Sequence, residues 1–397
     1  MVGLAMLPRI ILKKGKEKPL LRGHPWIFSG AIARIEGSVA PGDLGEAYAM
    51  DGSYLGAGHL NPRSQIVFRL LSGQREEKVD LSFFKERFSK AVVLRKEQLK
   101  GRTNAHRMVN GEGDFLPGLI VDRYGEVYVV QFLTAGMERS KEILVRLIAE
   151  EFHPESIYER SDASTRKEEG LPETRGLLFG EEVSDRIEIE EEGCLFQVNV
   201  KKGQKTGFYL DQRENRLLLR GISGGKRVLD CFCYTGGFAV HAGLGGAKEV
   251  TLVDSSEEAL TMAEEHFALN HLERVDRKRI RGDAFEVMRT LQPEYDILIL
   301  DPPPFAKRKG HVADAARGYK DLNLQAFRLL KSEGILLTFS CSHHIHRDLF
   351  QKIVFSAAVD AGRRVQLLGL RGHPVDHPIS LFHPEGEYLK GLICRVL

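Results

Sequence analysis

From about residue 226 onward, apolar segments alternate with helical ones. The apolar segments are RVLDCF, EVTLVDSS, KRIRGDA, YDILILD, GILLTFSCS, VQLLGL and, at the end, YLKGLICRVL. Between the second and third lies SSEEALTMAEEHFALNHL, where Ser255 and Glu258 have the spacing of a helix capping box. This alternation predicts an α/β fold, a parallel sheet with helices on both faces. Because ligands of such sheets bind beyond the carboxyl ends of the strands, we look for functional residues there.

The preceding residues have a different pattern. The first 75 or so contain the short strand-like segments RIILKK, GEAYAM, YLGAGHL and QIVFRLL, joined by glycine-rich turns, and predict a small all-β domain. LSFFKERFSKAVVLRKEQLK has helical spacing, GLIVDRYGEVYVVQFL predicts a hairpin, and ERSKEILVRLIAEEF predicts a helix. An acid-rich stretch at residues 181–192 marks a boundary. We therefore predict three domains, at residues 1–75, 76–185 and 186–397.

Composition narrows the class of protein. The 397 residues contain no apolar run near the roughly 18 that a membrane span needs, and the amino terminus makes a poor signal peptide. Five cysteines, an odd and small number, suit a reducing cytoplasm. Basic residues gather at 9–22, 85–107 and 307–309, although the net charge is only +2. Such patches favour a nucleic-acid partner, but solvated helix faces explain any single patch equally well.

Four acidic residues stand at or just after the ends of successive predicted strands: Asp230, Asp254, Asp283 and Asp301. Asp230 leads directly into CFCYTGGF, where Gly236 allows a ligand to approach the backbone closely. The dinucleotide fingerprint GxGxxG is absent, and four carboxylates would repel a pyrophosphate. S-adenosylmethionine has no phosphate, but it has ribose hydroxyls and a positive sulfonium and amine. Each acid alone could be a helix cap; together they predict an S-adenosylmethionine-dependent methyltransferase.

In this interpretation Asp254 accepts hydrogen bonds from the ribose, Asp283 accepts one from the adenine amino group, and Asp230 lies near the methionine amine. We also assign their neighbours Tyr234, Thr235, Ser255 and Ala284 to the cofactor site.

DPPPFAK, which begins at Asp301, resembles the (Asn/Asp)-Pro-Pro-aromatic motif of enzymes that methylate planar nitrogen-bearing bases. Pro302 is expected to shape the loop and contact the substrate, Phe305 is expected to stack on a base, and Lys307 is expected to contact RNA. Pro304 places the aromatic residue one position late, which weakens the case for exocyclic amine methylation. Lys13 and Lys14, in the first basic segment, are further expected RNA contacts.

Cys341 lies in FSCSHHIH, at the end of the fifth predicted strand. Carbon 5 of cytosine becomes nucleophilic when a thiolate adds to carbon 6, so a cysteine beside Asp301 predicts covalent catalysis. Asp301 would interact with ring nitrogen 3. A cysteine that simply packs as a small apolar residue is the plainer alternative. A zinc site with His343, His344 and His346 is another, but neither CxxC nor HExxH supports it, and we predict no metal.

These motifs and several longer segments resemble one family. LLRGHPWIFSGAI and YLGAGHLNPRSQIVFRLL are similar to its amino-terminal PUA module, an RNA-binding β-barrel, and VNGEGDFLPGLIVDRYG to its central α+β domain. GQKTGFYLDQRENR, LDCFCYTGGFAVHA, LVDSS, DPPPFAK and SCSHH are similar to its catalytic motifs, and DHPISLFHPEGEYLKGLICRV to its carboxyl end. The family is that of the bacterial PUA-domain, class I S-adenosylmethionine-dependent 23S rRNA 5-methylcytosine methyltransferases, and the likeness spans nearly the whole chain.

The resemblance implies a Rossmann-like methyltransferase sheet, S-adenosylmethionine as cofactor and 23S rRNA as substrate. It places Tyr209 and Asp211 near the methionine end of the cofactor and Cys341 at the nucleophile position. Other RNA 5-methylcytosine enzymes carry a second cysteine directly after Asp-Pro-Pro, where this chain has Pro304, so another group must assist product release.

Besides the zinc site, two alternatives stay open. The same fold could methylate a ring or exocyclic nitrogen of an rRNA base such as guanine, which needs no thiolate. The chain could also be a non-catalytic RNA-binding or assembly factor that retains a cofactor pocket. A homodimer is a further possibility that the sequence does not decide.

Overall fold

The structure is a computed structural model that describes residues 7–306 and 309–397. It divides into two compact units. The first contains the described residues up to Ile189, together with Val198–Leu210 and Val375–Gly386; the second contains Glu190–Gln197, Asp211–Pro374 and Glu387–Leu397. The predicted boundary in the acid-rich stretch lies close to the first of these divisions, while the three-domain scheme stays a prediction.

The amino-terminal part of the first unit is a six-stranded sheet of order β2-β6-β5-β4-β1-β3. Its strands are β1 (Arg9–Leu12), β2 (Trp26–Phe28), β3 (Ile32–Glu36), β4 (Asp43–Tyr48), β5 (Tyr54–Leu60) and β6 (Ile66–Ser72), with α1 (Lys18–Leu21) after β1. Four of them coincide with predicted strands. The prediction missed β2 and β3 because β2 has three residues and β3 is exposed along most of its length, so neither shows a buried-face alternation.

The rest of the first unit is built on a five-stranded sheet of order β11-β10-β9-β8-β7. Its strands are β7 (Ala105–Asn110), β8 (Leu119–Tyr124), β9 (Val127–Phe132), β10 (Ser156–Ser161) and β11 (Thr174–Gly180). The predicted long helix is α2 (Leu81–Leu99), which Asp80 caps, and β8 and β9 form the predicted hairpin. The second predicted helix is divided at Ser140 into α3 (Ala135–Arg139) and α4 (Lys141–Phe152), and α5 (Thr165–Glu168) follows β10.

The second unit contains a seven-stranded sheet of order β16-β15-β14-β17-β18-β20-β19. The strands are β14 (Arg227–Cys231), β15 (Glu249–Asp254), β16 (Asp276–Arg281), β17 (Tyr295–Leu300), β18 (Leu330–Ser340), β19 (Val365–Arg371) and β20 (Lys390–Val396). Strands β14 to β18 pair in parallel as predicted, but β20 is antiparallel to both β18 and β19. Arg371 pairs with Gly391, so the chain re-enters the sheet at the end where β19 stops, and β20 must run backwards.

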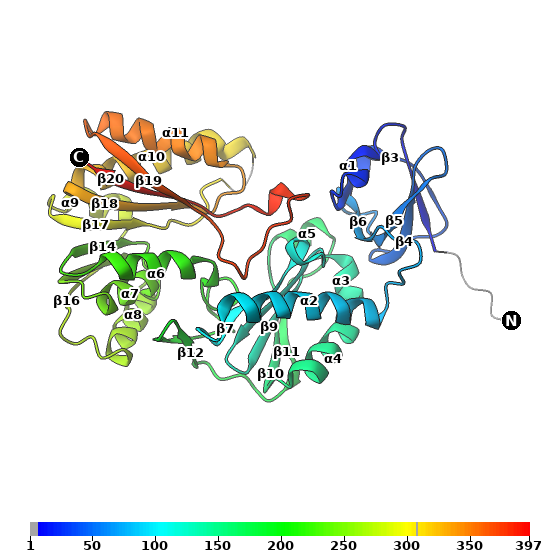
Figure 1. The fold of residues 1–397 in the computed structure, drawn as a ribbon, viewed down its shortest axis with the longest axis horizontal. Helices are drawn as coiled ribbons and strands as arrows, with labels where there is room; N and C mark the ends of the chain where they lie inside the picture. Colours follow the sequence, from blue (N-terminus) through cyan, green and yellow to red (C-terminus); the bar gives the residue numbers. More distant parts are fainter. Residues whose placement is uncertain (1–6, 307–308) are drawn as a thin grey trace. The chain divides into compact units, whose positions relative to one another are not determined.

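Helices cover both faces of this sheet, as predicted (Figure 1). One group is α6 (Arg213–Ile222), α7 (Gly237–Leu244) and α8 (Glu257–Leu269), in which α7 packs against α6 and α8. The other is α9 (Ala284–Thr290), α10 (Val312–Leu329) and α11 (Arg347–Asp360), in which α10 packs against α9 and α11. A short hairpin of β12 (Ile187–Glu191) and β13 (Cys194–Val198) precedes this unit's sheet. In the described ranges, no helix is both long and apolar enough to span a membrane.

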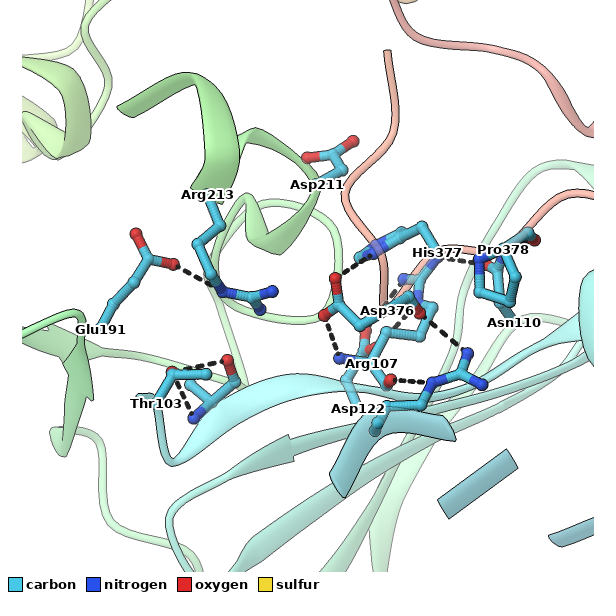
Figure 2. A network of polar contacts seen from close by, with 12 residues as sticks. Thr103, Arg107, Asn110, Asp122, Glu191, Asp211, Arg213, Asp376, His377 and Pro378 are labelled. Carbon is cyan, nitrogen blue, oxygen red and sulfur yellow. Dashed lines mark hydrogen bonds and ion pairs between the residues drawn. The ribbon is translucent and has the colours of Figure 1, made fainter. Parts of the chain in front are cut away.

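Residues 375–386, which lie between β19 and β20 in the chain, belong to the first unit. Buried Arg95 donates to the Asp376 carbonyl at 2.8 Å, the Arg107 N–H donates to the Asp376 carboxylate at 3.0 Å, and Asn110 donates to the Pro378 carbonyl at 2.9 Å. Figure 2 shows Asp376, His377 and Pro378 beside Arg107 and Asn110. This segment is thus held by the Arg95 side chain of α2 and by one backbone and one side-chain donor of β7.

Candidate functional site

Asp230 lies in β14, and its side chain is fully buried. One carboxylate oxygen accepts the Ala239 N–H at 3.1 Å, and the other has no hydrogen-bond partner among the residues that the structure describes. Burial, with a smaller contribution from the charge of Asp301, raises the pKa of Asp230 well above its usual value. A buried carboxylate with an unsatisfied oxygen is a site that a cationic group would stabilise.

The loop after β14 has an unusual backbone. Phe232, Tyr234 and Gly236 all have positive φ, at 62°, 48° and 76°. A Cβ on Gly236 would lie 2.8 Å from the Cβ of Ala263, so this position accepts only glycine without rearrangement. Left-handed non-glycine residues cost energy and gather at binding sites. The strained backbone of this loop costs stability, which is typical of a loop that binds a ligand.

Asp254 ends β15 and supports this loop. One of its oxygens accepts the Tyr234 N–H at 2.9 Å and the other accepts the Ser256 N–H at 2.9 Å. Sequence reasoning missed His266 on α8, whose buried ring lies 2.8 Å from the Thr235 carbonyl and fixes the same loop from the other side. A single histidine on an amphipathic helix carries no signal that would have revealed this contact.

The other predicted cofactor residues occupy the same edge of the sheet. Ser255 is exposed directly after β15, and Asp283 caps α9 by accepting the Phe285 N–H at 2.7 Å, with Ala284 buried behind it. Asp301 follows β17 and is half-buried. The charges of Asp301 and Asp254 both raise the pKa of Asp230, so the three carboxylates lie near one another.

This donor set fits S-adenosylmethionine. A cluster of carboxylates around buried Asp230 suits a ligand with a sulfonium and an amine, and Asp254 and Asp283 stand on adjoining strand ends where hydroxyl and amino groups could be bound. The same cluster is unsuited to a pyrophosphate.

Tyr209 and Asp211 come from the segment that joins the two units. In the first unit, the Tyr209 hydroxyl donates to Gln204, and the Lys205 ammonium lies 4.5 Å from the centre of its ring. The turn before Tyr209 is anchored because Thr206 donates to buried Asp122 at 2.6 Å. In the second unit, buried Asp211 accepts the Tyr388 hydroxyl at 2.8 Å. Their expected roles at the cofactor stay predictions.

Nearby in the second unit, an ion-pair cluster fixes the start of α6. Buried Glu191 forms ion pairs with Arg216 at 2.6 Å and with Arg213 at 3.5 Å, the second of which Figure 2 shows. Burial opposes ionisation of Glu191, but the arginines outweigh it and lower its pKa to about 2.

The structure brings together the two segments predicted to carry the chemistry. The Cys341 thiol donates to the Pro302 carbonyl, with sulfur and oxygen 3.7 Å apart. Behind it, the Ser342 hydroxyl accepts the Ala306 N–H at 3.3 Å and lies 3.0 Å from the Tyr319 hydroxyl. The loop after β17 is therefore bonded at two points to the loop after β18. Tyr319 on α10 had no motif that would have indicated its part in this junction.

Cys341 is also distinguished by its exposure. The other four cysteines are buried, whereas Cys341 is half-buried. Burial raises the pKa of Cys394 to about 12, and it raises the pKa of Cys231 and Cys233 well above the usual thiol value. Of the five thiols, Cys341 is the one placed to react.

Phe305, His343 and His346 have structural surroundings within the second unit. Phe305 packs on Tyr319 with ring centres 4.7 Å apart, so stacking on a base stays a prediction. His343 is exposed with its ring 5.9 Å from Tyr388, and His346 stands at the N-cap of α11. Among residues 7–306 and 309–397, no group of three or more His, Cys, Asp or Glu could hold a metal ion.

Of the lysines predicted to contact RNA, the structure describes two. Lys13 and Lys14 are exposed in the first unit, where the Lys13 ammonium donates to the Gly30 carbonyl at 3.0 Å. Lys307 lies outside the described residues.

Comparison with known proteins agrees with this geometry. Residues 10–73 match the model of a PUA-like domain, and residues 171–358 match that of an S-adenosylmethionine-dependent methyltransferase. The chain is 45% identical to ribosomal RNA large subunit methyltransferase I of Aeromonas hydrophila, over 98% of this chain and all of that one. It is 43% identical to the protein of the same name from Escherichia coli, over 99% of this chain and all of that one.

The chain belongs to the ribosomal RNA large subunit methyltransferase I family. The predicted family, the PUA-like amino-terminal domain and the S-adenosylmethionine cofactor are thereby confirmed, and the protein is a methyltransferase. The alternative of a non-catalytic factor is set aside.

Two solved structures share the family's fold over nearly the whole chain. One is a protein from Streptococcus mutans described as a SAM-dependent methyltransferase, with a TM-score of 0.82, 23% identity, and coverage of 98% of this chain and all of that one. The other is described as a methyltransferase complexed with SAH, with a TM-score of 0.84, 24% identity and the same coverage. At this identity they support the fold, and the Rossmann-like sheet is confirmed.

Proposed function

We propose that this methyltransferase forms 5-methylcytosine in 23S ribosomal RNA through a covalent adduct of Cys341. The observation that carries the proposal is the contact of the Cys341 thiol with the Pro302 carbonyl, which places the thiol beside the Asp-Pro-Pro loop. Its family relatives are named as ribosomal RNA large subunit methyltransferases, which supports the class of substrate.

The residues proposed to hold the cofactor are those around the ends of β14, β15 and β17. Asp230 is assigned to the methionine amine, Asp254 to the ribose and Asp283 to the adenine, with Tyr209 and Asp211 toward the methionine end. S-adenosylmethionine, when bound, supplies an electrophilic methyl group on a cationic sulfur. The buried, orphaned oxygen of Asp230 supports this assignment.

The proposed chemistry begins when the Cys341 thiolate forms a bond to carbon 6 of cytosine. The electron pair of the 5,6 double bond is then available at carbon 5. Carbon 5 would take the methyl group as the methyl–sulfur bond breaks, and S-adenosylhomocysteine would leave with the electron pair of that bond. Asp301, as the protonated carboxyl, donates a hydrogen bond to ring nitrogen 3 and stabilises the negative charge that develops there. Removal of the carbon 5 proton by a base restores the double bond and expels the thiolate, so the enzyme is regenerated.

The substrate cytosine is expected to be unpaired or flipped out, because a thiol cannot reach carbon 6 within a stacked duplex. The residues proposed to contact this RNA are Phe305, Lys307, Lys13 and Lys14. We place the activity in the cytoplasm, where rRNA is made in bacteria, and a homodimer stays a prediction.

Replacement of the nucleophile tests the proposal. Cys341→Ala should abolish 5-methylcytosine in 23S rRNA from cells that contain it as the only copy, measured by mass spectrometry of nucleosides. Cys394→Ala is the matched control, because that thiol is buried in β20, and it should retain full methylation. RNA containing 5-fluorocytosine should form a denaturant-resistant adduct with the wild-type chain, since fluorine cannot leave as a proton does.

Full methylation by Cys341→Ala would overturn the covalent mechanism. Appearance of a methylated ring or exocyclic nitrogen in place of 5-methylcytosine would favour the remaining alternative, methylation of a base such as guanine on the same fold.

A further inference from the structure

Lys390 is a buried cation next to the proposed nucleophile. It is the first residue of β20, where it pairs with Ser340 of β18, and its exposed fraction is 2%. Its ammonium donates to the Ser342 carbonyl at 2.7 Å and to the Tyr388 carbonyl at 2.7 Å. Ser342 directly follows Cys341, so Lys390 is bonded to the backbone that carries the thiol.

The ammonium lacks the partner that a buried charge ordinarily has. Both of its hydrogen bonds go to carbonyls, and in the described parts of the chain it forms no ion pair with a carboxylate. Buried charges are normally paired, because an uncompensated one is costly. Burial accordingly lowers the pKa of Lys390 to about 8.

Three charged groups act on Lys390: Cys341, Glu387 and Arg347. Cys341 and Glu387 favour the protonated ammonium, and Arg347 opposes it. Glu387 is itself ion-paired with Arg347, so those two charges largely cancel. The anion that remains to compensate the ammonium is the thiolate of Cys341.

We propose that Lys390 is a positioning residue that stabilises the Cys341 thiolate and holds its loop through the Ser342 carbonyl. This inference rests on the proposed function only for the use of that thiolate in methyl transfer. A nearby opposite charge lowers a thiol's pKa by about one to three units, which multiplies the thiolate fraction at neutral pH by about ten or more. Because the ammonium loses its proton as the pH rises above about 8, the benefit is present below that pH and fades above it.

The test is the pH dependence of alkylation of Cys341 by iodoacetamide, followed by peptide mass spectrometry. Cys341 can be read individually because the other four thiols are buried. Lys390→Gln keeps a donor for the carbonyls but removes the charge, so its alkylation midpoint should rise and its rate at pH 7 should fall about tenfold. Lys390→Arg retains the charge and should stay near the wild type. Lys331→Gln, on an exposed residue of β18, should leave the profile unchanged.

An alkylation profile of folded Lys390→Gln that overlays the wild type would overturn the proposal. If that variant does not fold, the thiolate absorbance difference between the wild type and Cys341→Ser gives the Cys341 pKa directly. A value at or above the ordinary thiol range, about 8.5, would contradict the inference. Alkylation does not depend on methyl transfer, so loss of the covalent mechanism in the Cys341→Ala experiment leaves this result readable. In steady-state assays Lys390→Gln should lower kcat without changing KM for S-adenosylmethionine.

Discussion

At the scale of single residues, the candidate site contains a buried carboxyl, that of Asp230, whose ionised form lowers the stability of the folded chain. Asp230 is fully buried with one oxygen unpartnered, and its pKa is raised mainly by burial. A carboxyl whose pKa is higher in the folded than in the unfolded chain weakens the fold as the pH rises from its unfolded value toward its folded one. A bound cation reverses this effect by favouring the ionised form. If Asp230 binds the cofactor's amine as proposed, its burial lowers the stability of the cofactor-free protein and raises the affinity for the cofactor.

Asp230→Asn should therefore separate stability from binding. At neutral pH the melting temperature of the cofactor-free protein should rise by a few degrees, while the affinity for S-adenosylmethionine should fall about tenfold or more. In the wild type the affinity should increase as the pH rises through the titration of Asp230, with proton release on binding; the variant should lose that proton release. Calorimetry in buffers of different ionisation enthalpy measures both. Asp348→Asn, at an exposed position of α11, is the control. Unchanged proton release would contradict the assignment.

At the scale of elements, the decisive feature is the turn between β14 and α7. Its positive φ angles and the close approach of Gly236 to Ala263 on α8 bring the helix amino terminus near the strand ends. Asp254 and His266 then hold the turn through backbone groups. The geometry is therefore set by packing between α7 and α8 as much as by the loop's own residues.

Gly236→Ala should cost about 2 to 3 kcal/mol of unfolding free energy, because it combines a left-handed backbone with a Cβ contact of 2.8 Å. Affinity for S-adenosylmethionine should fall with it. Gly221→Ala is a matched control: it lies in α6, with nothing within 4 Å of its new Cβ, and should be neutral or slightly stabilising. Denaturant unfolding measures the first effect and calorimetry the second. Equal stability of the two variants would show that the turn relaxes without cost.

At the scale of the whole molecule, the chain joins a PUA-like domain to a methyltransferase sheet, and Val375–Gly386 returns from the second unit to the first. The overall charge is nearly balanced, so binding of a polyanion must come from local patches. Lys13 and Lys14 are exposed members of one such patch.

Replacement of Lys13 and Lys14 by alanine should weaken RNA binding at every sequence tested. It should reduce the slope of log affinity against log salt by about one per lysine that contacts a phosphate. Filter binding across a salt series measures this. Lys352→Ala on α11, where the lysine pairs with Asp348, is the control. An unchanged slope would remove these lysines from the interface.

Much of the architecture was predictable from local patterns in the amino-acid sequence. The alternation of apolar strands and helices predicted the sheet, because that pattern is periodic and local. The four strand-end aspartates predicted a ligand site at one edge of the sheet, and that placement stays a prediction. The segments GQKTGFYLDQRENR and SCSHH were among those that indicated the family, and the family is confirmed. The short strands β2 and β3 and the antiparallel β20 were beyond such patterns, since pairing direction depends on where the returning chain enters the sheet.

The contacts between side chains that are distant in the sequence depend on the tertiary structure. Cys341 and Pro302 are 39 residues apart and Lys390 and Ser342 are 48 apart, yet both hydrogen bonds form because β17, β18 and β20 are neighbours in one sheet. His266 and Tyr319 joined the site without any motif, since a residue on an ordinary helix acquires such a part from what the helix packs against. Local periodicity can be read from neighbouring residues in the sequence, whereas proximity between distant residues arises only when the strands pair in the folded sheet.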